Sequence, residues 1–129
     1  MTKTYTNKFD IDLKFGEERE AMVASILGES KDKIEVKTER DWWHKTGNIA
    51  IEIECRGKPS GLSVTEADYW FHILARGKSN YAIIMFEVPV LKKIVEKFKD
   101  NTKMIGDGWQ SKCVLIPLSE VFKSANLID

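Results

Sequence analysis

The sequence predicts a single α/β domain built on a mixed β-sheet flanked by helices. Segments with helical spacing of apolar residues alternate along the chain with segments of strand-like alternation. Two of the strand-like segments are nearly continuous apolar runs, which are typical of strands covered on both faces. The chain has 129 residues and is 43% hydrophobic, which suffices for a core without disulfides or metal ions. We therefore interpret residues 1–129 as one domain.

The first half of the chain is predicted to form a helix followed by an antiparallel hairpin. Residues 16–28 (GEEREAMVASILG) have apolar side chains at helical spacing, acids in the first turn and a terminal glycine. Residues 32–40 (DKIEVKTER) and 48–55 (NIAIEIEC) alternate between apolar and charged side chains. The turn at residues 41–48 contains glycine, so we expect these two segments to pair as a hairpin.

The second half is predicted to run helix, strand, helix, strand. Thr65 is a suitable N-cap for a helix over residues 65–76 (TEADYWFHILAR). Residues 80–88 (NYAIIMFEV) form an apolar run that is expected to be a buried strand. A proline then precedes an amphipathic helix over residues 91–100, and residues 112–118 (KCVLIPL) are expected to form the last strand.

Composition restricts the class of protein. Twenty basic and twenty acidic residues cancel, so no global positive field indicates a nucleic-acid partner, although a local basic site remains compatible with one. Cys55 and Cys113 lie in apolar runs and are interpreted as buried thiols in a reducing compartment. The N-terminal residues lack a signal-peptide pattern, and no apolar run approaches the ~20 residues that span a bilayer. We expect a soluble cytoplasmic protein without a membrane partner.

Several common catalytic signatures are missing from the sequence. His44 has no second histidine or cysteine at zinc-ligand spacing, which argues against a zinc site. There is no Ser/His/Asp signature, no phosphate-binding P-loop and no dinucleotide-binding glycine pattern. His72, inside the predicted second helix, is interpreted as a packed histidine. Candidate chemistry therefore concentrates in the predicted hairpin.

The polar face of the predicted hairpin carries four acids and a lysine. Glu52 and Glu54 alternate with apolar residues and are expected to share one face, together with Glu35, Lys37 and Glu39 of the partner strand. One interpretation is a solvated face whose charges pair across the strands, at ~0.2–1 kcal/mol per pair. The other is a site in which the acids hold a divalent cation and the lysine acts on a water or on developing charge.

Two neighbouring segments are candidates for contacts with nucleic acid. In RGKPSG (residues 56–61), Arg56 and Lys58 would contact phosphates and Ser60 would add a neutral donor. The same composition is also common in plain connecting loops. At the hairpin tip, Trp43 is a candidate for stacking on bases, with Lys45 beside a phosphate. Adjacent tryptophans on a strand point to opposite faces, so either Trp43 or its neighbour is expected in the core.

The order of these features resembles the PD-(D/E)xK nuclease superfamily, and more narrowly its small Holliday-junction-resolvase-like members from phages and prokaryotes. The resemblance rests on GEERE at residues 16–20 and IEIECRGKPSG at residues 51–61. It covers roughly residues 14–90 and implies a restriction-endonuclease-like core of helix, hairpin, helix and strand. It also implies a Mg²⁺- or Mn²⁺-dependent DNA endonuclease that hydrolyses phosphodiester bonds in branched or otherwise non-duplex DNA. Dimers are common among resolvase-like members, so the resemblance also implies a homodimer.

The resemblance assigns roles to individual residues. The (D/E)xK pair of the family falls on Glu52 and, at the lysine position, on Glu54. Some members use an E-x-E variant, and others take the lysine from a neighbouring strand, where Lys37 lies. The upstream acid of the family corresponds to Glu35, with Asp32 as the alternative. The implied metal ligands are therefore Glu35, Glu52 and Glu54.

The acid of the first helix corresponds to Glu20, with Glu17 and Glu18 as alternatives. Because the family lysine is replaced at position 54, a second hypothesis is a nuclease fold that binds nucleic acid or a protein partner without cutting. A third is a protein-interaction module whose hairpin face is simply solvated.

Overall fold

The computed structural model describes residues 3–28 and 33–123 of the chain, with side chains from residue 13 onwards. The chain divides into two compact units, residues 1–31 and residues 32–129. The first unit contains one long helix, α1 (Lys3–Gly28), which begins well before the predicted start at residue 16. Neither glycine nor proline occurs between Lys3 and Phe15, so nothing in that segment ends the helix.

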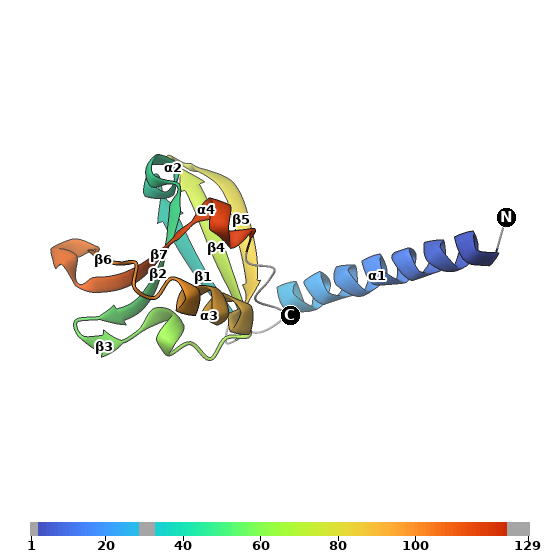
Figure 1. Cartoon of the computed structure of the whole chain (residues 1–129), viewed down its shortest axis with the longest axis horizontal. Helices are drawn as coiled ribbons and strands as arrows, with labels where there is room; N and C mark the ends of the chain where they lie inside the picture. The colour runs from blue at the N-terminus through green and yellow to red at the C-terminus, as the bar shows by residue number, and fades with distance from the viewer. Residues whose placement is uncertain (1–2, 29–32, 124–129) are drawn as a thin grey trace. The chain divides into compact units, whose positions relative to one another are not determined.

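The second unit is an α/β structure with two β-sheets (Figure 1). The first sheet has the strand order β1-β4-β5, with β1 (Ile34–Arg40), β4 (Tyr69–Arg76) and β5 (Ser79–Glu87). The second has the order β3-β2-β7-β6, with β3 (Lys58–Pro59), β2 (Asn48–Cys55), β7 (Ser111–Pro117) and β6 (Thr102–Ile105). The connecting helices and turns are α2 (Trp42–Thr46), η2 (Gly61–Ser63), α3 (Val88–Lys97), η3 (Asp107–Trp109) and α4 (Leu118–Val121).

The first sheet is mixed and the second is antiparallel. In the first sheet, β1 pairs with β4 in parallel and β4 pairs with β5 antiparallel. In the second sheet, all three pairings are antiparallel. The predicted class, an α/β structure with a mixed sheet and flanking helices, is confirmed. Within the described part of the chain, no helix combines the length and the hydropathy that a bilayer crossing requires.

The predicted hairpin between the segments at 32–40 and 48–55 is wrong. Both segments are strands, but β1 pairs with β4 and β2 pairs with β7. The connection between them is not a tight turn, because α2 occupies residues 42–46 and sends the chain into the other sheet. Long-range pairing has therefore overridden the local signal of alternation and glycine.

The predicted helix over residues 65–76 is also wrong, because residues 69–76 form β4. The run YWFHIL is apolar apart from His72, and such a run does not distinguish a helix from a strand by periodicity. Its aromatic residues favour a strand that packs between neighbours. Thr65 does not cap a helix; its hydroxyl accepts a hydrogen bond from the backbone N–H of Ala67 at 3.2 Å, closing a turn.

The remaining predictions for the second half are confirmed as elements. The run at residues 80–88 is strand β5, the amphipathic segment is helix α3, and the last apolar run is strand β7. However, β5 lies at the edge of its sheet and is not covered on both faces, since Tyr81 and Ile83 are exposed. The short edge strand β6 was not predicted, because its four residues carry no distinct pattern.

The core of the second unit lies between the two sheets and α3. Ile49 and Ile51 of β2 and Val114 and Ile116 of β7 are completely buried. From the first sheet the core receives Trp70, Leu74 and Phe86, and from α3 it receives Leu91, Ile94 and Val95. The spacing of these last three residues matches the apolar stripe of an amphipathic helix.

A tight hairpin joins β2 to β3 and folds the following loop back onto β2. Arg56 and Gly57 form its two-residue turn, with φ values of 54° and 79°, as a type I′ turn requires. Beyond β3, the backbone of Gly61 (φ 53°) passes against β2, and a Cβ placed there would lie 2.3 Å from the carbonyl oxygen of Glu52. Glycine at this position allows the loop to cover Glu52.

We predict that Gly61→Ala destabilises the second unit by about 3 kcal/mol or more, because it combines left-handed backbone strain with a clash against a main-chain oxygen. Gly57→Ala is the matched control, since its φ is also positive but its surroundings are open; it should cost about 1–2 kcal/mol. Urea unfolding of both variants measures the difference. Equal losses would show that the loop does not pack against β2 as described.

Candidate functional site

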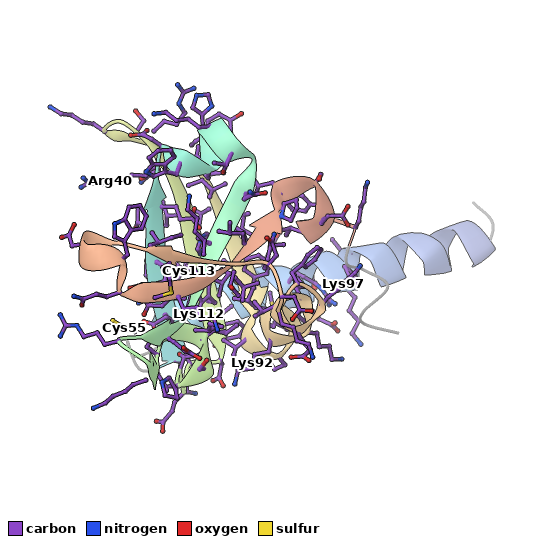
Figure 2. The ribbon with its side chains drawn as sticks, turned by 60° about the vertical axis from the view of Figure 1, so that its left-hand side comes forward. Arg40, Cys55, Lys92, Lys97, Lys112 and Cys113 are labelled. Atoms are coloured by element: carbon purple, nitrogen blue, oxygen red, sulfur yellow. The ribbon has the colours of Figure 1, made fainter. Side chains whose placement is uncertain are left out.

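A β-bulge in β2 separates the two acids that were expected to share a face. Glu52 lies opposite Cys113 of β7, whereas Glu54 lies opposite Lys112, with a shift of register between the two pairs. Cys113 and Lys112, both labelled in Figure 2, are consecutive in one strand and so point to opposite faces. Glu52 and Glu54 therefore also lie on opposite faces, and the expected shared face is wrong. Re-aiming one side chain in this way is a usual effect of a bulge.

Three charged residues of β1, Glu35, Lys37 and Glu39, point towards the protein interior, the reverse of what alternation suggested. The parallel register places Glu35, Lys37 and Glu39 beside Trp70, His72 and Leu74. These three residues of β4 are all buried, so the polar side of β1 faces inward and is half-buried. Val36, expected in the core, is 52% exposed on the other side.

Glu39 joins the two sheets through one carboxylate oxygen. Its Oε1 accepts a hydrogen bond from the backbone N–H of Ala50 in β2 at 2.5 Å and lies 2.6 Å from Nε2 of His72 in β4. The indole N–H of Trp70 donates to Nδ1 of His72 at 3.1 Å. Because an indole nitrogen is a donor and never an acceptor, Nδ1 carries no proton and Nε2–H donates to Glu39. A buried chain of donors thus fixes the orientation of the Glu39 carboxylate.

Glu52 is held from the loop that follows its strand. The hydroxyl of Ser60 donates to Oε2 of Glu52 at 3.0 Å, and the backbone N–H of Ser60 donates to the carbonyl oxygen of Ile53 at 3.0 Å. The contact that Ser60 makes in the structure is with this carboxylate, and its role as a donor to phosphate stays a prediction. Gly61 allows this approach, as described above.

Each of the two carboxylates keeps one oxygen accessible. The bonds of Glu39 all involve Oε1, and the bond of Glu52 involves Oε2. No buried side-chain oxygen or nitrogen among the described residues lacks a hydrogen-bond partner. Oε2 of Glu39 and Oε1 of Glu52, which accept no hydrogen bond from the described residues, are therefore in contact with solvent.

The two carboxylates lie in the same neighbourhood. Glu39 binds the N–H of Ala50, and Glu52 follows Ala50 by two residues on the same strand, a rise of about 7 Å. Burial, then the negative charge of Glu52 and then that of Glu39, raise the pKa of the Cys113 thiol to about 11. Both carboxylates therefore act electrostatically on one buried side chain. We call Glu39 and Glu52 the carboxylate pair.

The structure does not place the other acids predicted as site residues in this pair. Glu54 faces the opposite side of β2, and Glu35 lies four residues before Glu39 on β1. Glu20 is exposed on α1, in the first unit. Asp32 lies outside the described residues. Among the residues that the structure describes, no group of three or more His, Cys, Asp or Glu side chains is arranged to hold a metal ion.

The residues predicted to contact phosphate at the loop are exposed, with one exception. Arg56, at the turn, donates from its backbone N–H to the carbonyl oxygen of Gln110 at 2.9 Å and from Nε to the side-chain oxygen of Gln110. Lys58 is exposed on β3. Ser60, as noted, is half-buried against Glu52.

Trp43 and Trp42 divide between the core and the surface. Trp43 is 8% exposed and donates its indole N–H to the carbonyl oxygen of Ala75 at 2.8 Å, so its ring faces are not free to stack on a base. Trp42 is 69% exposed. The ammonium group of Lys45 lies 5.0 Å from the centroid of the Trp42 ring. The prediction that Trp43 stacks on bases is therefore wrong, because Trp43 is the buried member of the pair and Trp42 is the exposed one.

Glu39 is the candidate residue that sequence reasoning placed on a polar face without giving it a role. The sequence does indicate that Glu39 shares a face with Glu35 and Lys37, because the three residues are spaced by two positions along one strand. The partner that makes it distinctive, His72, lies 33 positions away and was assigned to a helix. No local pattern links the two residues.

Comparisons of the chain with protein-family models, with curated proteins and with solved structures find no match.

We predict that Glu52→Gln lowers the pKa of Cys113 from about 11, because loss of a nearby negative charge makes the thiolate less unfavourable. The pKa is measured from the ultraviolet absorbance of the thiolate during a pH titration in a Cys55→Ser background. Glu54→Gln is the control and should leave the pKa unchanged, because Glu54 lies on the other face. An unchanged pKa in Glu52→Gln would place this carboxylate away from Cys113.

Proposed function

We propose that the protein is a metal-dependent DNA endonuclease in which the carboxylate pair, Glu39 and Glu52, holds Mg²⁺ or Mn²⁺. One observation carries the proposal. Two carboxylates from different strands both act electrostatically on Cys113, each is fixed through one oxygen, and the other oxygen of each is in contact with solvent. Fixed carboxylates that keep an accessible oxygen are suited to binding a hard divalent cation.

The number of ligands is compatible with this kind of metal. Mg²⁺ usually keeps several of its waters and is bound by one or two carboxylates together with substrate phosphates. A pair of carboxylates therefore suffices, and a cage of three or more protein ligands is not required. A bound divalent cation would neutralise charge on the phosphate and lower the pKa of a coordinated water.

The surrounding residues would keep the pair in place. The N–H of Ala50 and the imidazole of His72 hold Glu39, and the hydroxyl of Ser60 holds Glu52. Hydrogen bonds to ligating carboxylates orient them, and their loss typically reduces metal affinity or activity 10- to 100-fold. His72 and Ser60 are therefore positioning residues in this proposal.

The likeness to the PD-(D/E)xK superfamily supports the proposal through its acids. Glu52 keeps the role that the resemblance implied, and Glu39 takes the place of Glu35 as the acid of the neighbouring strand. The element order gives less support to a restriction-endonuclease-like core, because β4 stands where that family has a helix. We propose that the second unit is a divergent relative of that core.

The alternative function is a nuclease-like protein that binds nucleic acid without cutting. Its support is Glu54, which occupies the position of the family lysine and lies opposite Lys112 of the neighbouring strand. In that case the carboxylate pair would have a structural role, with Glu39 connecting the two sheets. Binding and cleavage assays separate the two functions.

We predict that Mn²⁺ raises the melting temperature of the wild-type protein, because a ligand that binds the folded state stabilises it by about 2.7 kcal/mol at 100 times its Kd. Glu52→Gln should abolish the rise, and Glu54→Gln should retain it. Cleavage of plasmid, duplex, single-stranded and four-way-junction DNA is measured in parallel, with Mg²⁺, with Mn²⁺ or with EDTA. Glu52→Gln should lower the cleavage rate more than about 100-fold.

Two outcomes would contradict the proposal. If Glu52→Gln and Glu54→Gln respond equally to Mn²⁺, the metal is not held by the carboxylate pair. If no DNA is cut with either metal while DNA is still bound, the non-cutting alternative holds.

Lys37 gives a separate prediction about the nucleophile. It lies two residues before Glu39 on the same inward side of β1, where its ammonium group is suited to orienting a water or stabilising developing charge. Lys37→Ala should therefore lower the cleavage rate by about 100-fold or more while the response of the melting temperature to Mn²⁺ persists. Undiminished cleavage in this variant would show that the reaction proceeds without the lysine.

A further inference from the structure

One end of the first sheet carries a cluster of exposed cations and aromatic rings that the carboxylate pair does not use. It is formed where β1 ends, where β4 turns into β5, and where α2 follows β1 (Figure 1). We call this cluster the α2 patch. Its members are Arg40, Trp42, Lys45, Arg76, Lys78 and Tyr81, and all six are exposed.

The α2 patch is strongly positive although the whole chain is neutral. Residues 40–46 and 76–81 contain four lysine or arginine residues and one acid, Asp41. The Oδ1 atom of Asp41 accepts a hydrogen bond from the backbone N–H of Gly77 at 3.1 Å, so this carboxylate binds the β4–β5 turn. The nearby helix α4 begins beside Gly47, and its Glu120 pairs with Lys123 at 4.0 Å. The local charge is therefore available to an anionic partner.

Backbone contacts hold the two segments of the patch together. The N–H of Asp41 and the indole N–H of Trp43 both donate to the carbonyl oxygen of Ala75, at 3.1 and 2.8 Å. The bond from Gly77 to Asp41 adds a third link between α2 and the β4–β5 turn. The strand register also places Arg40 beside Ala75. The backbone segments that carry the cations are thus held in fixed positions relative to each other.

Two exposed aromatic rings stand among these cations. Trp42 is 69% exposed and Tyr81 is 72% exposed. The Tyr81 ring packs against the buried Trp43 ring, with ring centroids 5.3 Å apart. The ammonium group of Lys45 lies over the ring of Trp42. Exposed rings between cations are the arrangement that binds unpaired nucleotides, since bases stack on the rings and phosphates meet the cations.

The patch begins one residue after Glu39, on the other side of β1. Glu39 and Arg40 are consecutive residues of β1, with Glu39 on the inward side and Arg40 on the outward side. Arg40 is labelled in Figure 2.

We propose that the α2 patch binds single-stranded DNA, with Trp42 stacking on an unpaired base and Arg40, Lys45, Arg76 and Lys78 contacting phosphates. The proposal rests on the proposed function for its choice of DNA and extends it to a defined surface. Paired bases in a duplex present no free face to an indole, so the surface discriminates in favour of unpaired nucleotides. The partner is recognised by charge and stacking, without a requirement for a base sequence.

The test measures binding of fluorescent oligo(dT) and of a matched duplex to the full chain in Ca²⁺, in a Glu52→Gln background that prevents cutting. Trp42→Ala should weaken single-strand binding about 5- to 150-fold, and Trp42→Phe should restore most of it. Trp109→Ala is the matched control, because Trp109 is 67% exposed but lies in η3, at the other end of β7 from α2. It should have no effect on single-strand binding.

A second pair of variants tests the charges. Lys45→Ala/Lys78→Ala should make the slope of log K against log[salt] shallower by ~1.4 for oligo(dT), since each phosphate contact contributes ~0.7 for single strands. The control is Lys92→Ala/Lys93→Ala on α3, which begins where β5 ends, away from the β4–β5 turn (Figure 1). It removes the same charge and should leave the slope unchanged.

The results separate this inference from the proposed function. Equal single-strand affinity in wild type, Trp42→Ala and Trp109→Ala would overturn the inference, whether or not the protein cuts DNA. Equal changes of slope in the two lysine pairs would also overturn it, because the effect would then follow from net charge. Loss of binding in Trp42→Ala, in a protein that never cleaves, would support the inference and contradict the nuclease proposal. All variants are first compared by urea unfolding, and exposed positions should retain wild-type stability.

Discussion

The shared carboxylate of Glu39 is the interaction on which the arrangement of the second unit depends. One oxygen binds a backbone N–H of β2 in the second sheet and the imidazole of His72 in the first. Hydrogen bonds to a charged group are worth about 1.5–3 kcal/mol each, and a buried donor that loses its acceptor costs a similar amount of stability. Removing Glu39 would therefore leave both the N–H of Ala50 and His72 unsatisfied between the sheets. The contact between the two sheets and the proposed metal site therefore both depend on the side chain of Glu39.

A structural role and a metal-binding role are compatible here because they involve different oxygens. Oε1 of Glu39 carries the contacts between the sheets, and Oε2 is accessible. Glu52 shows the same division, with Oε2 bound to Ser60 and Oε1 accessible. A carboxylate whose orientation is already fixed loses little side-chain entropy when it binds a ligand. This division favours a binding role for the pair over a purely structural one.

The placement of charge explains how a neutral chain can present a surface to an anionic polymer. The acids of the carboxylate pair are turned inward or held by the loop after β2, whereas the cations at the end of the first sheet are exposed. The single acid in the α2 patch, Asp41, is occupied by the backbone of Gly77. Net charge describes solubility and long-range attraction, but local fields decide where a partner binds.

The sequence by itself determined the strands at residues 34–40 and 48–55, the amphipathic helix α3 and the last strand, because alternation and helical spacing are local properties. It also named Glu52 and the loop of residues 56–61 as candidates, and that choice stays a prediction. The tertiary structure alone decided which strands pair, and with that the face of each charged residue. Parallel pairing of β1 with β4 turned Glu39 inward, and one extra residue in β2 moved Glu54 to the opposite face from Glu52. A mostly apolar run such as YWFHIL is compatible with either a helix or a strand, and the elements that pack against it decide which one forms. Register and bulges depend on contacts between residues distant in sequence, so local periodicity does not contain them.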